Sequence, residues 1–237
     1  MQTIAIAGRK GGVGKTSLTV ALASYCTNLG LKTLVVDLDP QSNAGYCLGV
    51  EDLSHSGTAH LLLRQSFLPQ QVRDNLWVLT GGIELEGGAI QQLDADELAL
   101  SLQNIEADVV LFDCPPGQET LERFALMAAN QALLCTDSHP QARLGIARLV
   151  NYLERRRQTQ RHYPRWAIAA RIADRRRLAD RSLVTDLQAD YPSTPVFEIP
   201  SDSDLFYATA NGIPLLEAAP KARICIALSS IWKWTHE

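Results

Sequence analysis

The sequence predicts a doubly wound α/β fold, a mostly parallel sheet flanked by helices, in a single domain that spans residues 1–237. Two observations predict it. Short apolar runs alternate with longer segments of helical period, which is the pattern of parallel strands joined by helical crossovers. A glycine-rich segment, Gly8–Ser17, also lies between an apolar run and a helical segment, and a phosphate-binding loop requires that context.

The short apolar runs and the segments of helical period predict the individual strands and helices. The short apolar runs predict strands at Thr3–Ala7, Thr33–Asp37, Leu76–Leu79, Val109–Asp113, Ala132–Cys135, Ala167–Ile172 and Val196–Ile199. The segments of helical period predict helices at Lys15–Leu29, Glu119–Ala129, Gly145–Arg157, Leu178–Ala189, Asp204–Asn211 and Lys221–Trp234. The glycine pairs Gly81-Gly82 and Gly87-Gly88 are expected in loops.

Composition excludes several classes of protein. The chain has 237 residues, of which 46% are hydrophobic and 20% are charged, so it can bury a sizeable core and is not disordered or fibrous. The few apolar residues before Arg9 are too short for a signal peptide, and no apolar run reaches the roughly 18 residues of a membrane span. These features predict a cytoplasmic protein.

The segment KGGVGKTS has the Gly-Lys-Thr end of a phosphate loop, but Arg9 stands where the strict motif has a glycine. Glycines let the backbone wrap around phosphate oxygens, Lys15 can reach the β- and γ-phosphates, and the Thr16 hydroxyl can bind Mg²⁺. A second lysine, Lys10, has no role in the ordinary motif. The expected nucleotide contacts are Lys10, Gly11, Gly12, Val13, Gly14, Lys15, Thr16 and Ser17.

Two later strands end in acidic residues. LVVDLDPQSN places Asp37 and Asp39 at the end of one strand, and VVLFDCPPG places Asp113 at the end of another. Because the carboxyl ends of parallel strands face one crevice, these acids can meet a metal–nucleotide complex that the loop holds. Capping of a following helix is the alternative role, and it fits Asp37 better than Asp39 or Asp113.

KGGVGKTS, VVDLDPQSNA and VVLFDCPPG resemble the three nucleotide motifs of the ParA/MinD ATPases, the group with a deviant Walker A phosphate loop. A weaker resemblance over ARIADRRRL and ANGIPLLEAAPKA extends the similarity to nearly the whole chain. Because the phosphate loop begins at the N-terminus, the resemblance is closest to short ParA-type partition ATPases, which lack an N-terminal helix-turn-helix. Operator-specific DNA binding is therefore not expected.

The resemblance implies roles for single residues. Lys10 would be the signature lysine that crosses a dimer interface to the partner's nucleotide, whereas Lys15 would serve its own ATP. Asp39 would orient the attacking water at the metal site, Thr16 would bind Mg²⁺ directly, and Asp113 would hold it through water. Lys10, Lys15 and Asp39 are thus the expected catalytic residues, and Thr16, Asp39 and Asp113 are the expected metal-site residues.

Basic residues concentrate in one segment of an acidic chain. Residues 143–181 hold 12 arginines and lysines against 3 acidic residues, although the whole chain has a formal net charge of −4. Arginines at this density suit contacts with the phosphates of DNA without sequence preference, and a solvated surface is the alternative. The expected DNA contacts are Arg155, Arg156, Arg157, Arg161, Arg165, Arg175, Arg176 and Arg177. Some of the last three, with Arg171, could instead line the adenine pocket or the dimer interface, so the first cluster, Arg155–Arg157, is favoured for DNA and the second, Arg175–Arg177, for nucleotide or interface effects.

The resemblance and the charge pattern together imply a Mg²⁺-dependent ATPase that acts as a dimeric switch. It would bind nonspecific DNA on the nucleoid when loaded with ATP, and a ParB-like or adaptor protein would stimulate its slow hydrolysis. The cargo would be a plasmid, a chromosome region or another cellular structure.

Three alternatives are open. A MinD-like ATPase needs a basic amphipathic helix that lies on lipid, but CIALSSIWKWTHE carries Lys233 as its only lysine or arginine, so a membrane partner is not expected. A reductase like the nitrogenase iron protein needs paired cysteines, whereas Cys26, Cys47, Cys114, Cys135 and Cys225 are scattered. A ligase or kinase of the same fold would need acceptor-binding residues, and the sequence identifies none.

Overall fold

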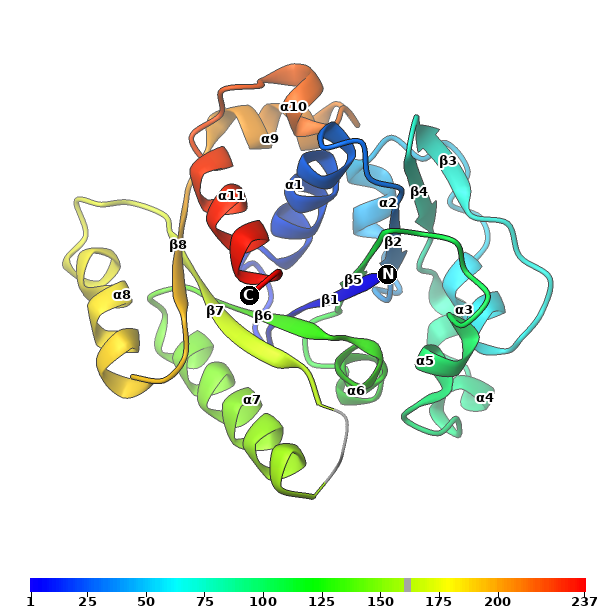
Figure 1. Ribbon diagram of the computed structural model, residues 1–237, viewed down its shortest axis with the longest axis horizontal. Helices are drawn as coiled ribbons and strands as arrows, with labels where there is room; N and C mark the ends of the chain where they lie inside the picture. Colours follow the sequence, from blue (N-terminus) through cyan, green and yellow to red (C-terminus); the bar gives the residue numbers. More distant parts are fainter. Residues whose placement is uncertain (160–162) are drawn as a thin grey trace.

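The computed structural model describes residues 1–159 and 163–237 as an eight-stranded sheet between two layers of helices (Figure 1). The strand order is β3-β4-β2-β5-β1-β6-β7-β8, and every neighbouring pair is parallel except β3 and β4. The strands are β1 (Gln2–Ala7), β2 (Thr33–Asp37), β3 (Gln70–Arg73), β4 (Leu76–Leu79), β5 (Val109–Asp113), β6 (Gln131–Thr136), β7 (Arg165–Ile172) and β8 (Val196–Pro200).

Helices cover both faces of this sheet. One face packs against α3 (Gly57–Leu62), α4 (Gly88–Gln91), α5 (Glu97–Ser101), α6 (Glu119–Ala128), α7 (Pro140–Thr159) and α8 (Leu178–Asp190). The other face packs against α1 (Lys15–Asn28), α2 (Asn43–Cys47), α9 (Ser203–Ala210), α10 (Leu215–Ala218) and α11 (Cys225–Trp234). In Figure 1, α1, α9, α10 and α11 lie on one side of the strands and α6 and α7 on the other.

The sequence accounts for these layers. All residues of β2 and β5 are buried, which is expected of continuous apolar runs covered on both faces. The amphipathic helix α7 turns Ile146, Leu149 and Leu153 into the core. The predicted doubly wound α/β fold is confirmed, and each predicted strand is present with its ends within about two residues of the prediction.

The secondary structure differs from the prediction at several places besides the short helices α2, α3, α5 and α10, which were not predicted. The edge strand β3 was missed because its sequence, QQVR, has no apolar run. The predicted loop at Gly87-Gly88 is wrong, since Gly88 is the first residue of α4. Helix α7 begins at Pro140 and not at Gly145, because proline suits the first turn of a helix, where its missing N–H is not needed. The last helix, α11, begins at Cys225 and not at Lys221.

Helix α11 is docked on the sheet. Its residues Ala227, Leu228, Ile231 and Trp234 are buried, and the Trp234 ring meets Phe197 of β8 edge-on at 6.0 Å. The face that a lipid-binding helix would use is therefore buried in the protein core. Among residues 1–159 and 163–237, no helix has the length and hydropathy needed to cross a bilayer.

Candidate nucleotide-binding site

The loop between β1 and α1 has the backbone of an anion-binding turn. Gly12 and Gly14 take positive φ angles of 78° and 94°, a conformation that glycine adopts without strain. Gly8 has no room for a side chain, because a Cβ there would lie 2.8 Å from the carbonyl oxygen of Cys135. The loop leads directly into the first turn of α1, where free N–H groups favour anions.

The two lysines of the loop have different surroundings. Lys15 is 6% exposed, and its Nζ donates to the carbonyl oxygen of Lys10 at 3.3 Å. Lys10 points away from this centre, since its Nζ forms an ion pair with Asp137 Oδ2 at 2.8 Å. Asp137 follows the end of β6 in the same chain. Lys15 is thus placed inside the site, and Lys10 is held beside it.

Asp113 lies at the end of β5 and contacts the start of α1. Thr16 Oγ1 donates to one of its carboxylate oxygens at 2.7 Å, and Thr19 Oγ1 donates to the other at 2.9 Å. Asp113 is fully buried, and burial raises its pKa to about 6 despite the two hydroxyl donors. A buried carboxylate with so little compensation suits a position next to a bound cation.

Asp37 has the capping role that the sequence left open. Its carboxylate accepts hydrogen bonds from the backbone N–H groups of Ala44 and Gly45, at the start of α2, and from that of Asp39. Burial raises the pKa of Asp37 well above its ordinary value, and the nearby charge of Asp113 adds to this effect. Asp37 therefore shapes the segment that carries Asp39.

Asp39 lies in the turn after β2, where its Oδ1 accepts from the N–H of Gln41 at 2.9 Å. The segment after β4, which contains Gly81 and Gly82, packs against the Asp39 turn. A Cβ on Gly81 would lie only 1.9 Å from the carbonyl oxygen of Asp39. No other residue fits at this point of close approach. The sequence placed Gly81 in a loop but gave no sign that the loop supports Asp39.

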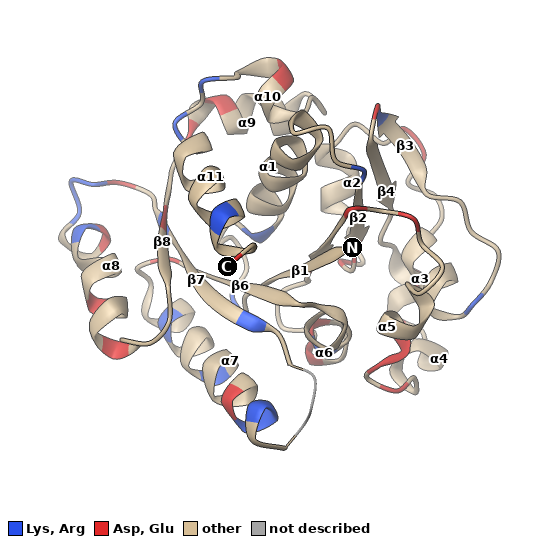
Figure 2. Ribbon diagram, viewed as in Figure 1, with Lys and Arg blue, Asp and Glu red and all other residues tan. Residues whose placement is uncertain are grey.

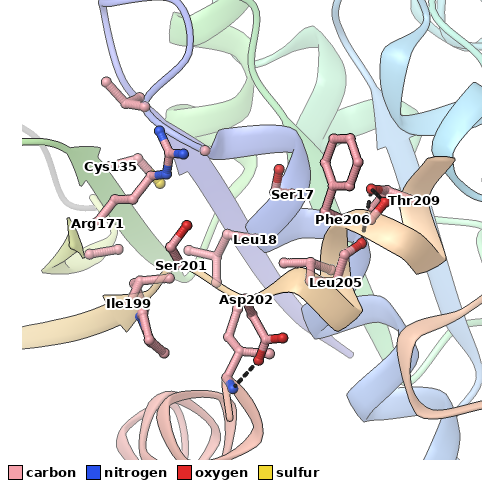
Figure 3. Close-up of a pocket in the computed structure, with 15 residues that line it drawn as sticks. Ser17, Leu18, Cys135, Arg171, Ile199, Ser201, Asp202, Leu205, Phe206 and Thr209 are labelled. Carbon is pink, nitrogen blue, oxygen red and sulfur yellow. Dashed lines mark hydrogen bonds between the residues drawn. The ribbon is translucent and has the colours of Figure 1, made fainter. Parts of the chain in front are cut away.

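A cavity of about 150 Å³ adjoins the loop on the side of β7 and β8. Figure 3 shows Arg171, Ser201 and Phe206 around it, facing Ser17 and Leu18 of α1. Its lining residues are Val13, Gly14, Ser17, Leu18, Cys135, Ala169, Arg171, Ile199, Pro200, Ser201, Asp202, Leu205, Phe206, Thr209 and Ile224. This mixture of apolar walls and a few polar groups is typical of a site for a small organic group.

Arg171 joins this cavity to the loop. Its Nη1 donates to the carbonyl oxygen of Gly12 at 3.0 Å, and its Cδ would lie 3.3 Å from a Cβ on Gly14. Asp202, in contrast, uses both carboxylate oxygens for structure, since it accepts from the N–H groups of Asp204 and Ile224. Arg171 is therefore the charged side chain of the lining that still has N–H groups to offer a ligand.

Comparisons with known proteins agree with this geometry. An AAA domain matches residues 1–163. The chain is 33% identical over 166 residues to the chromosome-partitioning ATPase Soj of Treponema pallidum, and the alignment covers 65% of the chain and 64% of Soj. The chain belongs to the ParA/MinD family of P-loop ATPases. The alignment spans less than two thirds of the length of this curated relative.

Solved structures of similar fold extend over the whole chain. A variant of Cyanothece McdA in complex with ATP superposes with a TM-score of 0.85 at 18% identity, covering 98% of this chain and 95% of that one. MinD of Pyrococcus horikoshii, complexed with Mg-ADP, superposes with a TM-score of 0.76 at 23% identity, covering 96% and 92%. At these identities the likeness concerns the fold.

The structure brings together most of the predicted nucleotide and metal residues of this ParA/MinD-family chain. Lys10, the glycines, Lys15, Thr16 and Ser17 form one loop at the carboxyl ends of the strands, and Asp113 contacts it directly. Asp39 lies at the same edge, after β2. We call this the carboxyl edge of the sheet, and the opposite end, where the parallel strands begin, the amino edge.

The predicted DNA-contacting arginines do not form one surface. One cluster, Arg175–Arg177, follows the end of β7 at the carboxyl edge. The other cluster, Arg155–Arg157, lies in the last two turns of α7 at the amino edge, where β7 begins with Arg165. Figure 2 shows these two separate groups of blue segments. The strand β7 between them spans roughly 25 Å at the usual rise per residue. Arg161 lies outside the described residues.

Sequence reasoning missed three features of the site. The pairing of Lys10 with Asp137, the support of Asp39 by Gly81 and the contact of Arg171 with Gly12 each join segments that are far apart in the chain. The available signals were that Asp137 and Arg171 lie near ends of predicted strands and that Arg171 was a candidate for the adenine pocket, whose cavity it does line. The cluster-bearing alternative gains no support, because Cys114 and Cys135 are buried as single free thiols.

Replacing Asp113 by asparagine is expected to stabilise the nucleotide-free protein. Because the folded pKa of about 6 exceeds that of an unfolded aspartate, the carboxyl group favours the folded state at acid pH, and this contribution is lost as pH rises from about 4 to about 6. Asparagine cannot ionise, so the variant does not carry the cost of a buried negative charge at neutral pH. Its unfolding temperature should therefore exceed that of the wild type by about 5 °C at pH 7.5 and by little at pH 4.5. Thermal unfolding without Mg²⁺ or nucleotide measures this.

The exposed Asp94 supplies the control, because Asp94→Asn changes the same chemical group without a buried carboxylate. That variant should unfold like the wild type at both pH values. An Asp113→Asn protein that is less stable than the wild type at pH 7.5 would contradict the prediction.

Proposed function

We propose that this chain is an ATP-hydrolysing switch that dimerises through its carboxyl edge and binds DNA of any sequence in the ATP-loaded state. Hydrolysis, stimulated by an adaptor protein, then releases the DNA, and the cycle positions a plasmid, a chromosome region or another cargo on the nucleoid. The observation that carries the proposal is that the arginine-rich segment after β7 lies on the same edge of the sheet as the phosphate loop.

The residues of the site fit ATP and Mg²⁺. The loop and Lys15 would hold the β- and γ-phosphates, and the cavity lined by Ser17, Arg171 and Phe206 would take the nucleoside. The Thr16 hydroxyl and the Asp113 carboxylate offer the oxygen ligands that Mg²⁺ prefers, directly or through water. When bound, the ion would neutralise charge on the phosphate oxygens.

Exposed apolar side chains support a dimer at the carboxyl edge. Leu144, Leu178 and Phe206 lie near the starts of α7, α8 and α9, which follow β6, β7 and β8, and their exposed fractions are 53%, 72% and 75%. Contact with a second subunit at this edge would remove their apolar surface from water. Lys10, which lies on the same edge, would leave Asp137 and reach the nucleotide of the other subunit.

A dimer of this kind explains how ATP could control DNA binding. Two copies of Arg175, Arg176 and Arg177 would be brought together, and two weak sets of phosphate contacts bind DNA much more tightly than one. In the single chain, Arg175 pairs with Glu198 and Arg176 with Asp174. These exposed pairs are weak, so DNA phosphates can replace the carboxylates.

The test measures DNA affinity with ATP across a salt series, by fluorescence anisotropy, on two unrelated duplexes. Replacing Arg175, Arg176 and Arg177 by alanine should weaken binding to both duplexes equally. It should also flatten the slope of log affinity against log salt by about 0.9 for each lost phosphate contact. The matched control is the triple alanine variant of Arg155, Arg156 and Arg157 at the amino edge, whose salt slope should change less.

An unchanged slope in the first variant, with ATP-dependent dimers intact, would remove this segment from DNA binding. DNA binding of equal strength without nucleotide would contradict the switch itself.

A further inference from the structure

The amino edge of the sheet carries a second cavity, remote from the nucleotide site. It has a volume of about 370 Å³ and lies between the end of α7, the start of β7, the turn before β8 and the end of α11. It is lined by Glu154, Arg157, Tyr163, Arg165, Trp166, Ser193, Thr194, Pro195 and Trp234. We call it the amino-edge pocket.

Two arginines of this pocket have no carboxylate partner in the part of the chain that the structure describes. Six other arginines of the described residues each pair with a carboxylate, namely Arg9, Arg64, Arg73, Arg143, Arg175 and Arg176. Arg157 and Arg165 are exposed and form no ion pair within residues 1–159 and 163–237. Glu154 also lines the pocket, but its single charge leaves the lining net positive.

An aromatic ring holds one of these two cations in a defined place. The Arg165 guanidinium lies over the Trp234 ring, 5.5 Å from its centroid, which orients the group and leaves its N–H edges free. Arg156, the neighbour of Arg157, instead turns back along α7, where it donates to the Tyr152 hydroxyl at 3.1 Å. The pocket therefore combines free guanidinium donors with the half-buried indole of Trp166.

We propose that the amino-edge pocket binds a glutamate-rich segment of a partner protein. A glutamate side chain matches both parts of the lining, because its methylene groups can pack on the half-buried Trp166 while its carboxylate accepts from Arg157 and Arg165. A concave pocket of this size admits single side chains, whereas the backbone of duplex DNA needs an open row of donors. The inference goes beyond the proposed switch, which uses the other edge of the sheet.

The position of the pocket predicts how bound nucleotide affects its affinity. The phosphate loop lies at the carboxyl edge, and the pocket lies at the opposite end of β7. A dimer that closes over the nucleotides would leave both pockets open at its outer ends. Binding at the amino-edge pocket should therefore have the same affinity without nucleotide, with ADP and with ATP.

The test uses a fluorescein-labelled peptide of six glutamates at low salt, with anisotropy as the readout. The peptide should bind the wild type, and a peptide of six glutamines should not. Arg157→Gln and Arg165→Gln should each weaken binding at least about tenfold, the usual effect of removing a charge-assisted hydrogen bond. The matched control is Arg148→Gln, which removes an exposed arginine from α7 outside the pocket and should change the affinity less than about twofold.

Thermal unfolding and DNA-independent ATP hydrolysis of the variants should equal those of the wild type, so a loss of peptide binding is separate from a failure of the fold or of the switch. Three results would overturn the proposal. The pocket variants could bind the peptide as the wild type does. Arg148→Gln could lose as much affinity as they do. A short duplex could displace the peptide and itself lose affinity in the pocket variants, which would make the pocket a DNA site.

Discussion

Lys10→Ala is expected to abolish ATP-dependent dimerisation and to lower ATP hydrolysis by about a hundredfold or more, while ATP binding through Lys15 persists. The reason is that a cation that meets the partner's nucleotide stabilises charge only when two subunits face each other, and loss of one such group commonly costs this much. Light scattering with a slowly hydrolysed ATP analogue measures dimers, and phosphate release measures hydrolysis.

The ion pair of Lys10 with Asp137 provides the control for this experiment. In the single chain the lysine is held at 2.8 Å from that carboxylate, so it must leave Asp137 to enter a partner's site. Asp137→Asn weakens this hold without removing the lysine, and its dimers should form at least as readily as those of the wild type. If Asp137→Asn lost dimerisation as Lys10→Ala does, the lysine would act by shaping its own loop and not across an interface.

The structure also shows why some of this fold could be predicted and some could not. The strands β2 and β5 are buried on both faces, so their sequences are continuous apolar runs that are easily recognised. The region between β2 and β5 contains helices of only four to six residues. Such helices make too few turns to display a period, and packing against the core stabilises them more than their own sequence does.

Some parts of the nucleotide site could also be predicted from the sequence, and others could not. The position of the loop was predictable because its residues are adjacent in a fixed context of strand, turn and helix. The position of Asp113 was predictable because it ends an apolar strand, and the carboxyl ends of parallel strands meet at one edge of the sheet. The supports of that loop come from β6, which pairs with β1, and from β7, which pairs with β6, and both strands follow β1 by more than a hundred residues. Asp137 and Arg171 acquire their roles only from that strand order.

The arginines show what the sequence could not place in space. The two clusters, Arg155–Arg157 and Arg175–Arg177, are close in sequence and both were expected among the DNA contacts, the second with the adenine pocket or the dimer interface as its alternative. The chain between them crosses the whole sheet along β7, so the clusters end at opposite edges. Net charge along a sequence reports the presence of a basic surface, but the strand direction decides how many such surfaces there are.

Asp39→Ala should have an effect opposite to that of Lys10→Ala, since it should leave ATP-bound dimers that accumulate and barely turn over. Asp39 follows β2 at the carboxyl edge, and one of its carboxylate oxygens, Oδ1, accepts from Gln41 N–H. The rest of the carboxylate can orient a water for attack on the γ-phosphate. Removing it should lower hydrolysis about a hundredfold or more, while Lys15, Thr16 and Asp113 still bind the nucleotide.

Asp39→Asn separates this role from a purely structural one. Asparagine keeps an oxygen that can accept from Gln41 N–H, and it fits the same turn against Gly81, but it lacks the negative charge that a water-orienting group supplies. Both variants should therefore hydrolyse ATP slowly and remain dimeric in its presence, as measured by light scattering and phosphate release. Recovery of wild-type hydrolysis in Asp39→Asn would mean that the negative charge of Asp39 is not needed and that the residue acts through its hydrogen bonds, such as the one from Gln41 N–H.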